Sequence, residues 1–319
     1  MYHQPVMLRE VLEYLRPVSG VIVDACLGGG GHARPILEAL AAGREGHQTG
    51  AASAGSHEPA LRGGDGRGQR RWPAGLLGID CDAEAVASAQ EQLGKYENME
   101  LVQANYADLP ALVRGRGLGP VTGVLFDFGA SLHQLTSGHR GFAIDADGPI
   151  DMRFDQAAPV PGALDLIRHS SETTLRDWFR AFGQEPMSGR IARVVHARRH
   201  ELATTGDLAR AVRSAVPARF ARKALARVFQ ALRIVTNHEI ENIRRGLAGA
   251  LAVLVPGGRL VALSYHSLED REVKQALRAG RVGGKLSVLT PKPVRPGAEE
   301  VAANPSSRSA RLRAAEVIS

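Results

Sequence analysis

Three short apolar runs in this chain each end in an aspartate. The runs are Val21–Val23, Leu76–Ile79 and Val121–Phe126, and the aspartates that follow them are Asp24, Asp80 and Asp127. Uninterrupted apolar runs are typical of strands that helices bury on both faces. Helical segments follow the first two runs, at Ala33–Ala42 and Ala83–Leu93, and a short strand is predicted at Glu100–Val102. This alternation predicts an α/β fold with a parallel, doubly wound, Rossmann-like sheet.

From about residue 155 to 227 the spacing of apolar residues is helical only. "ETTLRDWFRAFG", "SGRIARVVHARR" and "TTGDLARAVRSAV" place them three and four residues apart, and Thr205 or Asp207 is a candidate cap for the third helix. A long helix, Val228–Leu254, and a strand, Arg259–Tyr265, return the chain to the sheet, and "RSARLRAAEVI" is a candidate final strand. We therefore expect a helical domain over 143–227, inserted into a sheet domain made of 1–142 and 228–319.

Residues 43–75 interrupt this pattern. The stretch is rich in Gly, Ser and Arg and has no hydrophobic period, so we interpret it as a long disordered surface loop. Its Arg67, Arg70 and Arg71 either contact RNA or belong to a solvated tether.

Composition limits the class of protein. The chain has 319 residues, 44% hydrophobic residues and only two cysteines, so we expect a cytoplasmic protein with no disulfide framework, metal cluster or membrane span. The net charge of +7 favours a polyanionic partner such as nucleic acid. An arginine-rich genome is the alternative source of that charge. The oligomeric state stays open.

A glycine-rich turn, "DACLGGGGHARPIL", joins the first strand to the first helix. Glycines allow a ligand to approach the backbone, and a helix N-terminus offers free N–H groups. Gly28 and Gly30, followed by Ala33, satisfy a loose dinucleotide pattern, although such a loop is also a common tight turn. No Lys-Ser/Thr pair follows the glycines, which argues against a phosphate-gripping loop.

The strand-end aspartates narrow the choice of ligand. Asp24 precedes the turn directly and suits the cationic amino group of a methionine moiety better than a pyrophosphate. Asp80 stands where a carboxylate can accept hydrogen bonds from a ribose, as it also does in NAD-binding proteins. Together with the glycines they favour S-adenosylmethionine. Asp127 ends a third strand at the same edge, although any single one of these residues could simply cap a helix.

Longer motifs now carry a more specific resemblance. They are "VDACLGGGGHARPIL", "GIDCDAEA", "RGFAIDADGPIDMRFD", "FQALRIVTNHEIENI", "VPGGRLVALSYHSLEDREVK" and "EEVAANPSSRSARLRAAE". Over nearly the whole chain, apart from residues 43–75, the sequence closely resembles the bacterial small-subunit ribosomal RNA methyltransferase H family. The resemblance implies a class I methyltransferase that methylates N4 of a cytidine in the decoding region of 16S rRNA, as naked RNA or in the small ribosomal subunit.

The resemblance also implies roles for individual residues. Gly30, Gly31 and His32 would line the cofactor, and Asp80 would hold its ribose. Tyr106 would lie against the adenine, unless it is a core aromatic. Asp127 and Gln134 would complete the pocket near the transferred methyl group. His32 has an alternative role as a polar residue that caps the turn.

The chain departs from the family pattern beside the expected reaction centre. Leu132, His133 and Thr136 replace a serine, a proline and an acid that are usual there. The departure fits either a divergent orthologue or a paralogue with an altered substrate.

The cytosine amine is a poor nucleophile, so it must be aligned with the methyl group and its hydrogen bonds must be accepted. Asp127, with Gln134 and the turn that ends at Ser131, is the candidate for this work. Ser264, Tyr265 and His266 would shape the cytosine pocket, with Tyr265 stacking on the base. Alternatively, this segment only leads to a helix that Ser267 caps. The rival functions are a NAD-type oxidoreductase and a catalytically altered RNA-binding paralogue.

Overall fold

The computed structural model describes residues 5–51 and 74–318, which form two compact units. Unit 1 comprises the residues up to Gly129 and from Asn242 onward, and unit 2 is Ala130–Glu241. The helical unit is therefore longer at both ends than the expected 143–227. Helix α10 (Ala218–Thr236) crosses residue 227 without a break, and Arg140 donates to the carbonyls of Arg153 and Phe154, which ties the earlier segment to unit 2.

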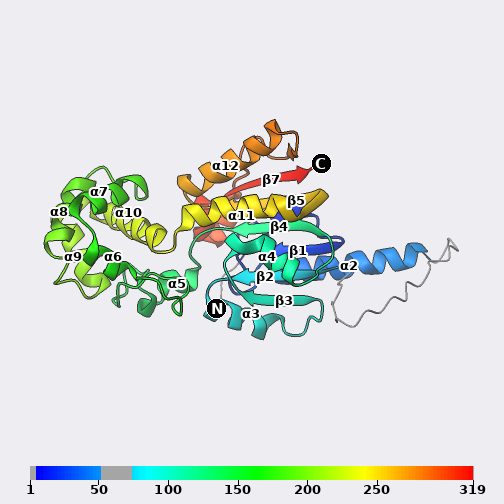
Figure 1. Ribbon diagram of the computed structural model, residues 1–319, viewed down its shortest axis with the longest axis horizontal. Coiled ribbons are helices and arrows are strands. Elements are labelled where there is room, and N and C mark those ends of the chain that lie inside the picture. The colour runs from blue at the N-terminus through cyan, green and yellow to red at the C-terminus, as the bar shows by residue number, and fades with distance from the viewer. Residues whose placement is uncertain (1–4, 52–73, 319) are drawn as a thin grey trace. The chain divides into compact units, whose positions relative to one another are not determined.

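Unit 1 contains a seven-stranded sheet in the order β3-β2-β1-β4-β5-β7-β6 (Figure 1). The strands are β1 (Gly20–Asp24), β2 (Ala74–Asp80), β3 (Met99–Gln103), β4 (Val121–Asp127), β5 (Leu254–Ser264), β6 (Leu286–Val288) and β7 (Arg311–Val317). The first five pair in parallel, while β7 runs antiparallel to both β5 and β6. The predicted strands are confirmed, β5 begins earlier than expected, and β6 was not predicted.

Helices cover both faces of this sheet, as the apolar runs predicted. Ile22 of β1 packs on the face covered by α1 (Leu8–Leu15), α2 (Ala33–Ala51) and α3 (Ala83–Leu93). The neighbouring Val23 packs on the opposite face, because successive side chains of a strand alternate. That face is covered by α4 (Leu109–Gly115), α11 (Glu239–Val253) and α12 (Ser267–Val282). The smaller elements are η1 (Tyr106–Asp108), α13 (Ala298–Ala303) and η3 (Pro305–Ser309).

Both ends of the loop predicted over 43–75 belong to regular elements. Helix α2 continues to Ala51, and β2 already begins at Ala74. The remainder, with Arg67, Arg70 and Arg71, lies outside the described residues. No helix of the described ranges is long and apolar enough to cross a bilayer.

Unit 2 is helical. Its helices are α5 (Leu132–Thr136), α6 (Ala163–His169), α7 (Glu172–Ala181), α8 (Ser188–Ala197), α9 (Thr205–Ala215) and α10, with a short η2 (Gly138–Arg140). Helices α6 to α10 share one apolar core. The cap of α9 is Thr204 and neither Thr205 nor Asp207. The Thr204 hydroxyl accepts from the backbone N–H of Asp207, whose carboxylate accepts from that of Thr204 in return.

The helix predicted over 228–254 is two helices. Helix α10 ends at Thr236, His238 has a φ of 51°, and α11 begins at Glu239. Asn237 causes the break: its amide nitrogen donates to the carbonyls of Met152 and Arg233, and its oxygen accepts from the N–H of Phe154. These contacts across unit 2 stabilise a turn where apolar spacing alone suggested a continuous helix.

Candidate active site

The three strand-end aspartates lie at one edge of the unit 1 sheet. Asp24, Asp80 and Asp127 end β1, β2 and β4, and β1 pairs in parallel with both of the other strands. Because the carboxyl ends of parallel strands face the same way, the predicted meeting of these residues is confirmed. The helix after β2 is capped by Asp82, not by Asp80.

Asp24 is a buried carboxylate with an unused oxygen. Only 1% of the residue is exposed, and its Oδ1 accepts a 3.4 Å hydrogen bond from the N–H of Cys26. Its Oδ2 is buried and has no hydrogen-bond partner among the described residues. Burial, together with the charges of Asp127 and Asp80, raises the pKa of Asp24 to about 7. Such an oxygen would be stabilised by a cationic ligand group.

Asp80 links the glycine turn to the sheet. Its Oδ2 accepts from the N–H of Gly28 at 2.8 Å and its Oδ1 from that of Asp82 at 2.9 Å. Burial raises the pKa of Asp80 to about 6, against the lowering effect of these two bonds. Since each carboxylate oxygen can accept twice, Asp80 keeps acceptor capacity for a ligand hydroxyl.

The glycines of the turn serve different purposes. Gly28 and Gly30 both have positive φ, at 51° and 82°. A Cβ on Gly30 would lie 2.9 Å from the Leu93 side chain, so this glycine permits close packing on α3. A Cβ on Gly28 would meet open space, so Gly28 is the position where a ligand can approach the backbone. Gly31 lies between Gly30 and His32, in the turn that precedes α2.

Asp127 lies close to Tyr265 and His32. The hydroxyl of Tyr265 donates to its Oδ1 at 2.7 Å, and Nδ1 of His32 lies 3.5 Å from its Oδ2. His32 is 5% exposed, and its Nε2 donates to the carbonyl of Val6 at 3.0 Å. The structure therefore makes Tyr265 a support of Asp127, while His32 lies beside it. The cofactor contact predicted for His32 and the stacking predicted for Tyr265 stay predictions.

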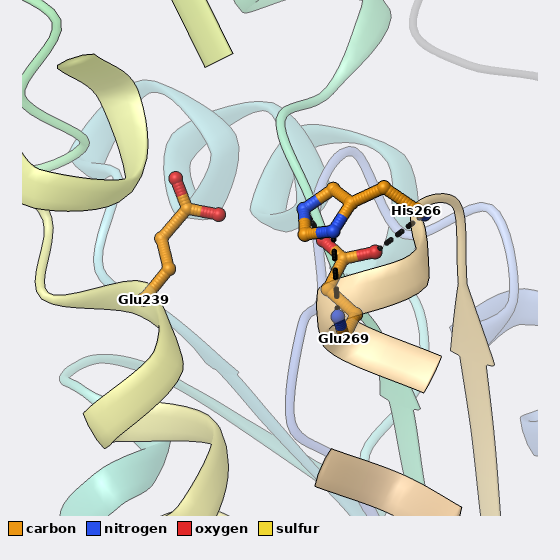
Figure 2. Close-up of side chains that lie close together, drawn as sticks. All are labelled: Glu239, His266 and Glu269. Carbon is orange, nitrogen blue, oxygen red and sulfur yellow. Dashed lines mark hydrogen bonds and ion pairs between the residues drawn. The ribbon is translucent and has the colours of Figure 1, made fainter. Parts of the chain in front are cut away.

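His266, not Ser267, caps helix α12 (Figure 2). Its ring Nδ1 accepts from the N–H of Glu269, and its Nε2 lies 2.9 Å from Oε1 of the same residue. Glu269 is fully buried, and its Oε2 accepts from the N–H groups of Tyr265 (2.8 Å) and His266 (3.1 Å). Glu239, drawn in the same figure, belongs to unit 2, where Arg233 donates to both of its oxygens.

Glu269 is the residue that sequence reasoning missed. Glu269 accepts from the backbone N–H of Tyr265 and so fixes the position of the residue whose hydroxyl binds Asp127. Its position three residues after His266 was a capping-box signal, but the cap was expected at Ser267 and the role was therefore not recognised. Ser264 is buried and donates a long hydrogen bond to the carbonyl of Arg311, so its described contact is structural.

Tyr106 lies in an aromatic cluster. Its ring makes edge contacts with Phe126 and Phe128, at centroid distances of 5.6 and 5.9 Å. A Cβ at Gly246 would lie 2.6 Å from the same ring, so the ring packs directly against this glycine. The alternative of a core aromatic thus accounts for these contacts, and the contact with adenine stays a prediction.

Ser131 and Gln134 lie in unit 2 and bind each other. The hydroxyl of Ser131 accepts from the N–H of Gln134, and Oε1 of Gln134 accepts from the N–H of Ser131 at 2.9 Å. Gln134 is 5% exposed. This capping box defines the start of α5, and the catalytic and cofactor roles of the two residues stay predictions.

The comparisons with known proteins identify the family of the chain. Residues 69–318 match the profile of the MraW methylase family. Over 337 aligned residues, 99% of this chain and 94% of the relative, the chain is 40% identical to "Ribosomal RNA small subunit methyltransferase H" of Thermomicrobium roseum. It is also 40% identical to the protein of the same name from Thermotoga neapolitana, over 99% of this chain and 96% of that one.

Solved structures are more distant. A putative rRNA-methylase from Clostridium thermocellum is 11% identical, with a TM-score of 0.43 over 98% of this chain and 95% of that one. The family is shown by the sequence matches, which confirm the predicted Rossmann-like methyltransferase and its methyl donor, S-adenosylmethionine. The chain belongs to the MraW methylase family.

Proposed function

We propose that this chain transfers the methyl group of S-adenosylmethionine to N4 of a cytidine in the decoding region of 16S rRNA. The names of the two relatives support a ribosomal RNA substrate of the small subunit. The net charge of +7 supports a polyanionic substrate. The choice of N4 and of the decoding region rests on the family resemblance of the motifs.

The unused oxygen of Asp24 is the observation that carries the proposal. S-adenosylmethionine presents an ammonium group and a sulfonium, and a buried carboxylate without a donor is stabilised by such a cation. Asp80 has acceptor capacity for the ribose hydroxyls, and the open side of Gly28 lets the ligand approach. The residues at this edge therefore fit the cofactor.

Asp127 is suited to handle the acceptor amine. Bound S-adenosylmethionine supplies an electrophilic methyl group, and the new N4–C bond forms as the S–C bond breaks. Asp127 accepts a hydrogen bond from the exocyclic N–H, which orients the nitrogen and stabilises the positive charge that develops on it. The surplus proton then leaves from N4 to the Asp127 carboxylate or to water. Tyr265 orients Asp127 before substrate arrives.

Methyl transfer to ribosomal RNA tests this function. The full chain is mixed with labelled S-adenosylmethionine and small subunits that lack the modification, and the digested nucleosides are identified by mass spectrometry. Labelled N4-methylcytidine is expected with the wild type. Asp127→Ala should lose about 100-fold or more in rate while S-adenosylmethionine still raises the melting temperature. Asp177→Asn, an exposed carboxylate of α7, is the matched control.

Three outcomes favour a different function. A label on another nucleoside would connect the altered residues Leu132 and His133, at the start of α5, with a changed target. Leu132 is 45% exposed and Leu135 of the same helix 42%. RNA affinity without stabilisation by S-adenosylmethionine would identify an RNA-binding paralogue. Stabilisation by NAD in its place would favour an oxidoreductase, which the methylase family match argues against.

We assign recognition of the RNA in part to helical unit 2, as its insertion into the sheet domain suggests.

A further inference from the structure

Helix α12 separates its charges by sign. Its three acidic side chains face protein groups: Glu269 accepts two backbone N–H groups, Asp270 binds Arg313 at 2.7 Å, and Glu272 binds Arg244 at 2.7 Å. The acids of this helix are therefore already neutralised within unit 1.

The basic side chains of α12 are all on the outside. Arg271, Lys274, Arg278 and Arg281 are exposed and make no hydrogen bond or ion pair with any described residue. Their spacing of three, four and three residues places them within an arc of about 80° over roughly 15 Å of helix. We call these four residues the α12 stripe.

The stripe is unfavourable for the isolated fold. Like charges three and four residues apart on a helix repel by a few tenths of a kcal/mol per pair. No acidic residue occurs between Glu272 and Glu299 to offset them. The opposite face of α12 is buried through Val273 and Leu277, so no apolar face is left to enter a membrane. A row of unpaired cations without an apolar face is complementary to a chain of phosphates.

The position of α12 connects the stripe to the reaction centre. The helix begins at Ser267, two residues after Tyr265, whose hydroxyl binds Asp127. From that edge α12 runs along the outer side of unit 1, over β5, β7 and β6 (Figure 1). A strand of RNA that presents its cytidine to Asp127 can therefore continue along this helix.

We propose that the α12 stripe binds the backbone phosphates of the substrate RNA next to the target nucleotide. The inference rests on the proposed function, because it takes the substrate to be RNA. Phosphate contacts supply affinity and register and carry no base specificity. The stripe therefore raises affinity for the RNA without taking part in methyl transfer.

Neutralising the stripe in the full chain tests this. The stripe variant carries four substitutions, Arg271→Gln, Lys274→Gln, Arg278→Gln and Arg281→Gln. A control variant removes the same charge elsewhere on unit 1, through Gln at Arg9, Lys95, Arg114 and Arg308, all of which are exposed. Binding of a 16S decoding-region RNA is measured between 50 and 300 mM salt, with methyl-transfer kinetics on small subunits.

The logarithm of the RNA binding constant falls linearly with the logarithm of the salt concentration, by about 0.7 for each phosphate contact to a single strand. The loss of four contacts should therefore make this slope shallower by about 3 in the stripe variant. Its KM for subunits should rise at least about tenfold, while kcat at saturating RNA and the melting-temperature gain from S-adenosylmethionine stay unchanged. Its own melting temperature should equal or exceed that of the wild type, since repulsion within the helix is removed. The control variant should retain the wild-type slope to within about 1.

An unchanged slope and KM in the stripe variant would overturn the inference, and so would an equal loss in the control. Binding of polyglutamate, a model of an acidic protein, is measured in parallel. A stripe variant that keeps its RNA affinity and loses its affinity for polyglutamate would also overturn the inference, because the surface would then fit an acidic protein. Loss of RNA affinity in the stripe variant supports the inference even if the wild type methylates no cytidine, an outcome that would count against the proposed function alone.

Discussion

The hydroxyl of Tyr265 donates to Oδ1 of Asp127 across 138 positions of the sequence. The bond joins the end of β5 to the end of β4, two paired strands of the sheet. Burial and the charge of Asp127 raise the pKa of Tyr265 well above its usual value, so the hydroxyl remains a donor at every physiological pH. Asp127 is thus oriented by the protein itself.

Tyr265→Phe should slow methyl transfer by about 10- to 100-fold, because it removes one hydrogen bond to a charged group and keeps the ring. The melting-temperature gain from S-adenosylmethionine should persist. Single-turnover rates at saturating cofactor measure the effect. Tyr96→Phe, which removes an exposed 3.3 Å bond to Glu38, is the control. An unaffected rate would remove Tyr265 from the support of Asp127.

Asp24→Asn should stabilise the cofactor-free protein at pH 8 by about 1–3 kcal/mol. The pKa of Asp24 is raised from 3.8 to about 7 in the folded state, so its contribution to stability is lost as pH rises through 7. The buried Asn amide lacks a full set of hydrogen-bond partners, and this cost offsets part of the gain in stability. Urea midpoints at pH 5 and pH 8 check this. The difference from wild type should fall by about 2–3 kcal/mol between pH 8 and pH 5. A constant difference at both pH values would contradict the assignment.

Affinity for S-adenosylmethionine should rise about five- to tenfold between pH 6 and pH 7.5, because the cation binds the ionised form of Asp24. Asp80, with a pKa of about 6, adds to the lower part of the rise. Calorimetric titration at constant ionic strength measures it. Asp24→Asn should bind more weakly and with a flatter profile, while Asp177→Asn should follow the wild type. A flat wild-type profile would exclude Asp24 as the cation site.

Glu269→Ala should lower stability by about 2–4 kcal/mol and also slow methyl transfer. The change leaves the N–H groups of Tyr265 and His266 without their acceptor and frees the backbone that positions the Tyr265 hydroxyl. Glu269→Gln keeps an acceptor oxygen and should recover most of both losses. Calorimetric melting and single-turnover rates test the pair. If Gln is as damaging as Ala, the negative charge is what matters.

Local patterns predicted an element well wherever its limits are set by its own run of apolar residues and by the polar residues at its ends. The limits of α3 and the ends of β1, β2 and β4 follow from apolar runs and from polar residues at their ends. The break at Asn237 was missed, because it depends on Met152 and Phe154, more than 80 positions away in the sequence. Helical spacing continues through the break and carries no sign of it.

The site shows the same division. Asp24, Asp80 and Asp127 were predicted together because strand ends define an edge. The contacts of Asp127 with Tyr265 and His32 depend on which strands become neighbours, and no local pattern states that. The caps at Thr204 and His266 were each misplaced by one or more residues, since several polar residues compete at a helix start and only the three-dimensional turn selects one.

The place of β7 has a consequence for synthesis. Among the described strands β6 pairs with β7 alone, and β7 also pairs with one edge of β5. These edges therefore lack this partner until Arg311–Val317 has left the ribosome. A nascent chain that has already formed β1 to β5 presents the open edge of β5 to other chains in that interval. Chaperones that shield strand edges would protect this protein most in the interval before β7 emerges.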